Sequence, residues 1–385
     1  MFDKYYYSTG CGNTAYGSTP EWHQKFASIA DAIIAELAPQ QVLDAGCAMG
    51  PRAESTPGIS ANSDHIIVSY MNYIRHLNPV NGQETWRYPE KSNVKQVFYA
   101  PALIDGENIY VGDFANDFMK INISGIPTVE WTFKVAKGWY QAKAVKDGSL
   151  IIAPNTDRSI YAIDDSNTLV WTHQGDFAYI SEPLVVEEMV IVSSQDHKIL
   201  FLNKADGTTI REVPMNGAVV AAPAYDPKTD SVFVGSLAHE FVRIDRQTGE
   251  IVWCYDGNGT LESIWGKALI VDGQVILSDK AGKIVSLSAD TGAENWQLYA
   301  GGAMPAGLAL VEDKGFVAVL EDGTITFYDL TQKSVWSRVI SGNVYSTPVV
   351  TENLILVAAI KGDNLIYVYA FDFQGQPVWT FKPAK

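Results

Sequence analysis

Tryptophan recurs at a nearly constant interval along most of this chain of 385 residues. The successive intervals are 45, 40, 82, 43, 40 and 43 residues, and they join Trp86, Trp131, Trp171, Trp253, Trp296, Trp336 and Trp379. The one long interval is about twice the others, and Arg211 stands near its middle in ADGTTIREV. The sequence therefore predicts eight repeats, one of which has arginine in place of the tryptophan.

Each repeat also contains a turn and several short apolar runs. Five repeats have a glycine four residues before the tryptophan or Arg211, where a tight turn favours a residue that tolerates positive φ. These are Gly82, Gly207, Gly249, Gly292 and Gly375. Runs such as NIYVG, SIYAID and KIVSLS alternate in the manner of strands, four to a repeat. Four strands every 40 to 45 residues are typical of a propeller blade.

We therefore expect an all-β, eight-bladed β-propeller of four-stranded blades over residues 55–381, beginning at STPGIS. No strand is left over to be shared between the ends, so the ring should close by packing of its first blade against its last. Seven blades with an irregular first repeat are the alternative. The tryptophans are interpreted as wedges between blades and not as ligand platforms, and Arg211 should mark a contact that is packed differently.

Composition restricts the class of protein. With 47% hydrophobic and 19% charged residues, the chain can bury a large core. Its net charge of −16 disfavours nucleic acid and anionic lipid as partners. No apolar run approaches the roughly 20 residues of a transmembrane helix. The three cysteines, Cys11, Cys47 and Cys254, are too few and too scattered for a disulfide framework or a four-ligand zinc site.

The spacing A/N/D-x-x-x-G-x-x-x-W, with strands such as IYVG and IYAID, resembles the pyrroloquinoline-quinone (PQQ) repeat. That repeat occurs in quinoprotein dehydrogenases and in cofactor-free relatives such as the propeller lipoprotein of the outer-membrane barrel-assembly machinery. In the dehydrogenases an adjacent cysteine pair stacks on the quinone, and acidic and amide groups hold calcium. This sequence has no adjacent cysteines. The resemblance thus implies a non-catalytic scaffold of the bacterial cell envelope, outside the cytoplasm, with a protein or glycan partner and no cofactor. A PQQ- and calcium-dependent dehydrogenase is the alternative.

Residues 1–50 do not follow the repeat. Pro20 begins an expected helix whose apolar face includes Phe26, Ile33 and Leu37. The following VLDAGCAMG resembles motif I of class I S-adenosylmethionine methyltransferases, which implies that Asp44, Gly46 and Gly50 are remnants of a cofactor site. The strand–helix units that such an enzyme needs are missing, so methyltransferase activity is the remote alternative, and these remnants are expected to bind no cofactor.

The same stretch resembles a bacterial lipobox, which implies acylation of Cys47 and a possible lipid anchor in the parent protein. However, Asp44 is a poor lipobox residue, and no apolar segment of a signal peptide precedes it. One hypothesis joins the two resemblances: a chimera of a methyltransferase-like fragment over residues 1–50, a linker over 51–54 and the propeller over 55–381.

Candidate site residues are few. His65, His76 and His173 are isolated in the sequence, and His197 and His239 occupy an expected turn position that Asp117 and Gly282 share. No catalytic motif or metal-ligand spacing occurs in the propeller. The best candidates for a binding face are aromatic residues in the loops that enter the innermost strands, although packing in the core or rim is their other possible role. They are Trp139, Tyr140, Phe177, Tyr179 and Trp265.

Overall fold

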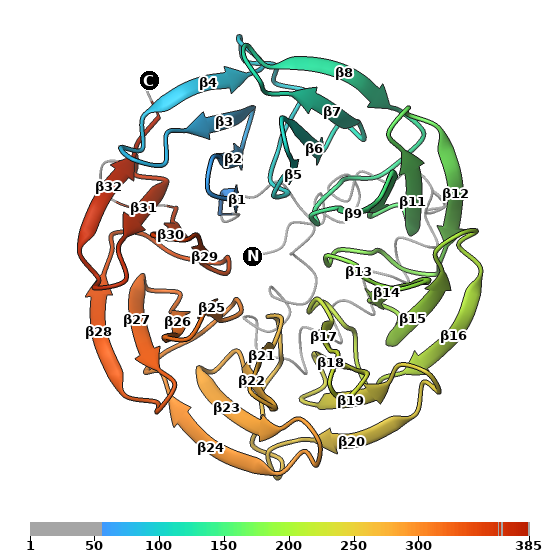
Figure 1. Ribbon diagram of the computed structural model, residues 1–385, viewed down its shortest axis with the longest axis vertical. Helices are drawn as coiled ribbons and strands as arrows, with labels where there is room; N and C mark the ends of the chain where they lie inside the picture. The colour runs from blue at the N-terminus through green and yellow to red at the C-terminus, as the bar shows by residue number, and fades with distance from the viewer. Residues whose placement is uncertain (1–55, 361, 363–364, 384–385) are drawn as a thin grey trace, which may run out of the picture. The chain divides into compact units, whose positions relative to one another are not determined.

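A computed structural model describes residues 56–360, 362 and 365–383. Within these ranges, eight antiparallel sheets of four strands each are arranged as the blades of a ring (Figure 1). The strands of each sheet follow chain order, and the last strand lies at the circumference. The eight-bladed, all-β propeller predicted from the sequence is confirmed, and the seven-bladed alternative is wrong. The predicted N-terminal helix lies outside the described residues.

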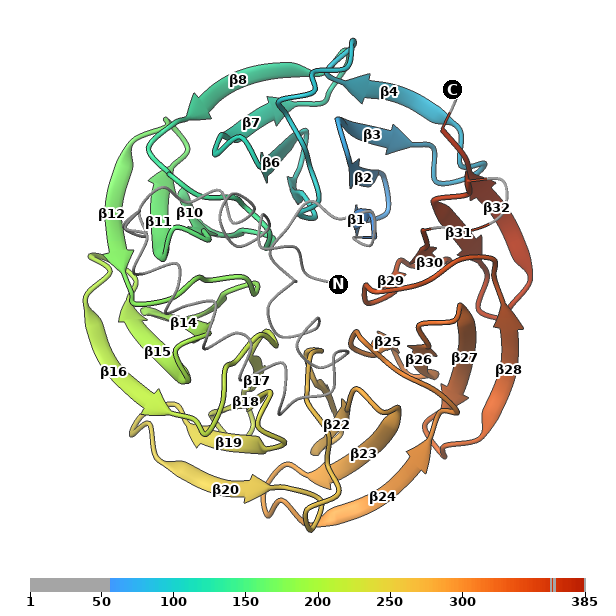
Figure 2. The same ribbon diagram turned by 180° about the vertical axis from the view of Figure 1, so that it is seen from behind.

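The innermost strand of each blade is also its shortest. The blades follow one another clockwise in Figure 1 and anticlockwise when the ring is seen from behind (Figure 2). Blades 1 to 4 consist of β1 (Gly58–Ala61), β2 (Ile66–Tyr70), β3 (Tyr73–Leu77), β4 (Glu84–Tyr88); β5 (Leu103–Asp105), β6 (Asn108–Gly112), β7 (Phe118–Asn122), β8 (Thr128–Phe133); β9 (Val145–Asp147), β10 (Leu150–Pro154), β11 (Ser159–Asp164), β12 (Leu169–Gln174); β13 (Leu184–Val186), β14 (Met189–Ser194), β15 (Lys198–Asn203) and β16 (Thr209–Pro214). Blades 5 to 8 consist of β17 (Ala224–Asp226), β18 (Ser231–Gly235), β19 (Phe241–Asp245), β20 (Ile251–Tyr255); β21 (Leu269–Val271), β22 (Gln274–Ser278), β23 (Lys283–Ser288), β24 (Glu294–Tyr299); β25 (Ala309–Val311), β26 (Gly315–Val319), β27 (Thr324–Asp329), β28 (Ser334–Val339); β29 (Val349–Val350), β30 (Ile355–Ala358), β31 (Val368–Phe371) and β32 (Pro377–Phe381).

The core lies between neighbouring blades, because each sheet is covered on both faces. Ile66, Ile67 and Val68 follow one another in β2, and none of the three is exposed. The side chains of Ile66 and Val68 pack toward blade 8, whereas that of Ile67 packs toward blade 2. Both faces of the strand are therefore buried, which requires a continuous apolar run. In a sheet with one face in solvent, apolar and polar residues would alternate.

The ring closes without strand exchange. All four strands of blade 1 come from the start of the described chain and all four of blade 8 from its end. Val68 of blade 1 and Leu356 of blade 8 belong to one apolar cluster, and the indole Nε1 of Trp379 donates to the carbonyl of Pro79 at 2.9 Å. Closure by packing of the first blade against the last is confirmed.

The repeated tryptophan joins each blade to the next. The indole of Trp171 donates to the carbonyl of Lys204 in the following blade at 2.8 Å. Gly207 of that blade has φ of 71° and lies so close to the indole that a Cβ would overlap it. The glycine of the repeat therefore meets two requirements, a left-handed backbone and room for the neighbouring ring.

Arg211 reproduces this contact in the repeat that lacks tryptophan. Its Nη1 donates to the carbonyl of Arg246 at 2.6 Å, and its side-chain methylenes lie against Gly249. The guanidinium stands 5.5 Å from the ring centroid of Phe201. A planar N–H donor on an apolar stem thus replaces the indole at the same position.

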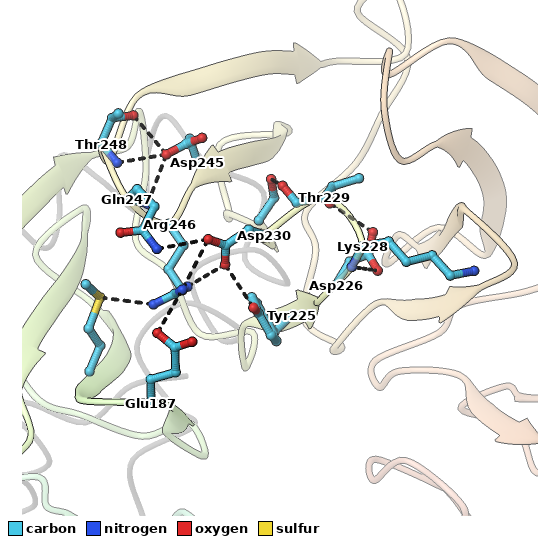
Figure 3. A network of polar contacts seen from close by, with 12 residues as sticks. Glu187, Tyr225, Asp226, Lys228, Thr229, Asp230, Asp245, Arg246, Gln247 and Thr248 are labelled. Atoms are coloured by element: carbon cyan, nitrogen blue, oxygen red, sulfur yellow. Dashed lines mark hydrogen bonds and ion pairs between the residues drawn. The ribbon is translucent and has the colours of Figure 1, made fainter.

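An ion network adds a second tie between the same two blades (Figure 3). Nη2 of Arg246 lies 3.1 Å from Asp230 of its own blade and 3.0 Å from Glu187 of blade 4. The Arg246 side chain is only 4% exposed. Its hydrogen bonds are the main cause that lowers the pKa of Asp230 to about 2. The network therefore stabilises the contact between blades 4 and 5 while both carboxylates are ionised.

Every outermost strand carries a β-bulge at the residue just before the tryptophan or Arg211. In β12, for example, Trp171 pairs with Ala162 and Leu169 pairs with Ile163, which leaves Val170 unpaired. The bulged residues are Thr85, Glu130, Val170, Ile210, Val252, Asn295, Val335 and Val378. Such bulges twist an exposed strand and hinder edge-to-edge association.

Candidate functional site

The chain connections alternate between the two faces of the ring. Because each sheet takes its strands in order, the loops between blades lie on the same face as the turns between second and third strands. Backbone hydrogen bonds join these two kinds of segment, as from Tyr140 to the carbonyl of Asp113 and from Tyr179 to that of Asn155, each at 3.2 Å. We call this side the connection face. All five aromatic residues predicted for a binding face lie in its loops.

Two of these five residues are buried. The side chains of Tyr140 and Tyr179 are each 1% exposed. The Tyr140 ring packs against Phe118 at a centroid distance of 5.1 Å and fills the space above Gly112, where a Cβ would overlap it. Tyr140 and Tyr179 are therefore packing residues and offer no surface to a partner, which corrects their inclusion in the predicted binding face.

The other three residues reach the surface to different degrees. Phe177 is 53% exposed, whereas Trp139 and Trp265 are half-buried. The indole nitrogen of Trp265 is buried and has no hydrogen-bond partner among the described residues. Neither Phe177 nor Trp265 makes a ring contact within the described part of the chain, so they stand apart from Trp139.

Trp139 is instead the end of a continuous row of aromatic rings. Its ring stacks on that of Phe114, with 5.0 Å between the ring centroids and an interplanar angle of 4°. The next centroid distances along the row are 5.2 Å from Phe114 to Tyr99, 5.7 Å from Tyr99 to Tyr70 and 4.7 Å from Tyr70 to Tyr367. We call Tyr367, Tyr70, Tyr99, Phe114 and Trp139 the aromatic row. It runs from blade 8 across blade 1 to the loop between blades 2 and 3, and all its members except the buried Tyr70 are half-buried.

The backbone holds the row in place. The N–H of Trp139 donates to Oγ1 of Thr156 at 2.7 Å, and its carbonyl accepts from the N–H of Thr156 at 3.0 Å. Phe114 donates its N–H to the carbonyl of Val97 at 2.9 Å. Burial raises the pKa of Tyr70 to about 12 and also raises that of Tyr99. Both phenols therefore stay neutral at physiological pH.

A buried carboxyl adjoins the row in the sequence. Asp113 is unexposed and precedes Phe114 in the chain. Its Oδ1 accepts the N–H groups of Ala115 and Asp117 at 2.8 and 2.9 Å. Burial nevertheless raises the pKa of Asp113 to about 6, because the two backbone donors only partly replace its lost hydration. The candidate site is thus an aromatic surface, and the residue before Phe114 is a buried acid whose pKa is raised to about 6.

The sequence did not indicate four members of the row. Tyr70 ends a strand, Tyr99 lies in a loop between blades, Phe114 lies in a turn and Tyr367 precedes β31. Their positions differ from repeat to repeat, so no common spacing links them. The available signal is an aromatic residue in any segment of the connection face, which includes turns and strand ends as well as the loops between blades.

Other predicted residues have simpler positions. His197 and His239 lie in turns, each with φ of 65°, and the equivalent residue of blade 2 is Asn116 and not Asp117. Asp44, Gly46, Gly50 and Cys47 lie outside the described residues. Among the described residues, no three His, Cys, Asp or Glu side chains form a group that could hold a metal ion. Within that same part of the chain, no helix has the length and hydropathy of a membrane span.

Comparison with known proteins agrees with this architecture. The family model described as outer membrane protein assembly factor BamB matches residues 70–224, 212–314 and 280–385. The crystal structure of BamB from Moraxella catarrhalis is similar with a TM-score of 0.69 and 16% identity, over 82% of this chain and 96% of that one. A computationally designed protein, Ika8, gives a TM-score of 0.71 and 16% identity, over 83% and 97%. No curated protein matches the sequence. The family match extends over most of the propeller, and the chain belongs to the family of the outer membrane protein assembly factor BamB.

Proposed function

We propose that this protein is a non-catalytic scaffold of the bacterial cell envelope that holds a protein partner during the assembly of outer-membrane proteins. Membership of the BamB family supports the setting and the process. The aromatic row supports a protein as the partner, because clustered tyrosine and tryptophan side chains dominate many protein–protein contacts. Outer-membrane association outside the cytoplasm belongs to the same proposal.

The geometry of the row favours binding over catalysis. Stacking holds its rings, and the N–H and carbonyl of Trp139 are both hydrogen-bonded to Thr156. Little conformational entropy is therefore lost when a partner covers the row. Half-buried rings offer apolar area together with phenol donors at Tyr99 and Tyr367. A rigid, amphipathic surface of this kind suits the centre of a protein interface.

The proposal is tested by capture from envelope extracts with the purified full-length protein as bait. We expect wild type to retain one or more proteins of the outer-membrane assembly apparatus, identified by mass spectrometry. The double substitution of Trp139→Ala and Tyr99→Ala should reduce retention at least tenfold. The control is Tyr299→Ala, because Tyr299 is 66% exposed and lies outside the row.

Equal retention by all three proteins, with unchanged thermal unfolding, would refute the row as the partner surface. Retention of a glycan in place of a protein would refute the proposed partner class. The dehydrogenase alternative from the sequence stays untested. Reconstitution with PQQ and calcium, followed by an assay of alcohol-dependent dye reduction, addresses it directly.

A further inference from the structure

Two histidines that are separate in the sequence meet in blade 1. His65 precedes β2 and His76 lies in β3, eleven residues further on. Nδ1 of His65 is 3.1 Å from Nε2 of His76, and the two rings are inclined at 63°. The sequence-based view of these histidines as isolated is wrong, because the β2–β3 hairpin returns the chain to the same place.

The blade architecture itself brings these two positions together. In blade 5 the equivalent residues are Ser231 and Arg243, which share a hydrogen bond of 2.9 Å. In blade 6 they are Gln274 and Ser286, which share one of 2.7 Å. The pairing is therefore a recurring diagonal contact between the second and third strands. Only the presence of two imidazoles is particular to blade 1 among these three blades.

The surroundings of His76 supply a hydrogen-bond partner for its second ring nitrogen. Its Nδ1 lies 2.6 Å from Oγ1 of Thr85, and that hydroxyl can donate to the carbonyl of His76 at 3.4 Å. In the tautomer with the proton on Nδ1, this nitrogen donates to Thr85, and Nε2 presents its lone pair toward His65. The His76 ring also stacks on that of Trp86, with 5.4 Å between the ring centroids and an interplanar angle of 13°. A histidine whose second nitrogen donates to a fixed acceptor is the usual arrangement for a metal ligand.

We propose that His65 and His76 bind one divalent transition-metal ion of the zinc and copper class through Nδ1 and Nε2. Two imidazole nitrogens bound to tetrahedral zinc lie about 3.3 Å apart, since each Zn–N bond is about 2.0–2.1 Å. The observed distance is 3.1 Å, so the nitrogens need to separate only slightly, while both rings turn to direct their lone pairs at one ion. Both rings are half-buried, so water completes the coordination. The proton on Nδ1 of His65 moves through solvent to its own Nε2, and the net protonation of the pair does not change.

Isothermal titration of the full-length protein with Zn²⁺ tests the site. His65→Ala and His76→Ala should each weaken binding at least tenfold relative to wild type. His197→Ala is the matched control, because that histidine is exposed in a turn of blade 4, and it should leave the affinity unchanged. His76→Phe keeps the stacking on Trp86 and replaces His76→Ala if the latter unfolds.

Titration with Cu²⁺ gives a second measurement. Electron paramagnetic resonance of the wild-type complex should show coupling to two imidazole nitrogens, and that of His65→Ala coupling to one. Equal zinc affinity in wild type and in the His65 and His76 variants would overturn the proposal, and so would dependence on His76 alone. Either result would mean that the two rings form only a hydrogen bond.

Discussion

Replacing Asp113 by asparagine should stabilise the protein at neutral pH. Asp113 is fully buried next to Phe114 of the aromatic row in the chain, and burial raises its pKa to about 6. The unfolded chain ionises this carboxyl near its ordinary pKa of 3.8. Between these values the unfolded state has lost its proton while the folded state retains it. The free energy of unfolding therefore falls as pH rises from about 4 to about 6.

The size of the effect follows from the shift in pKa. A shift of about two pH units corresponds to about 3 kcal/mol at 1.36 kcal/mol per unit. Asn155 holds the equivalent position in blade 3, where its Oδ1 accepts from Asp157 and its Nδ2 donates to Gly138. In the Asp113→Asn variant, Oδ1 keeps both backbone donors, and the amide of Gln96 can turn to accept from Nδ2. We expect a gain of about 1–3 kcal/mol at pH 7.5, since the loss of charged hydrogen bonds offsets part of the shift.

Urea unfolding of wild type and Asp113→Asn at pH 7.5 and pH 4.0 measures this directly. The advantage of the variant should be present at pH 7.5 and absent at pH 4.0. Asp322→Asn is the control, because Asp322 is an exposed turn carboxylate and should give no such pH dependence. An advantage of equal size at both pH values, or a variant less stable at pH 7.5, would refute the reasoning.

Two further substitutions test the contacts between blades. Gly82→Ala should destabilise the fold by about 2–4 kcal/mol, since Gly82 has φ of 69° and its new methyl would overlap Trp379 at the ring closure. Gly106→Ala, with φ of 55° but open space, should cost only about 1 kcal/mol in the same urea titration, and equal costs would exclude the overlap as the cause. Arg246→Met should destabilise the protein by about 1–3 kcal/mol at pH 7. This is less than the cost of breaking a fully buried ion pair, because the Asp230 side chain is 37% exposed. The pKa of Asp230 is lowered to about 2, so this difference should shrink as pH falls from 4 toward 2, and a difference independent of pH would contradict the role of the network.

The fold was predictable because blade packing imposes the same residues at the same spacing. Gly82 and Trp379 occupy repeat positions that must meet across a blade boundary, so both are visible in the sequence. Acidic turn residues recur for a similar reason. The carboxylate of Asp372, for instance, accepts the N–H groups of Gln374 and Gln376 at 2.9 and 2.8 Å. Requirements of local backbone and inter-blade packing therefore recur in every period and specify the architecture.

The candidate site was only partly predictable because it does not recur. Trp139 was identified from its loop, but Phe114 and Tyr99 come from other kinds of segment, and only the ring arrangement makes them neighbours. Tyr140 looked equivalent to Trp139 in the sequence. In the structure Tyr140 is buried in the core, whereas its neighbour Trp139 is half-buried at the surface. Arg211 shows the converse: the sequence marked it as an exception, whereas the structure shows that it makes the same contact as tryptophan.

Site-specific photo-cross-linking in living cells tests the central proposal most directly. p-Benzoylphenylalanine is introduced in place of Trp139 in the aromatic row, or in place of Asp206 in an exposed turn on the opposite face. The proposed scaffold function predicts an adduct between position 139 and a protein of the outer-membrane assembly apparatus, with none from position 206. Adducts from position 206 alone, or none from position 139 in cells that express the protein, would contradict it.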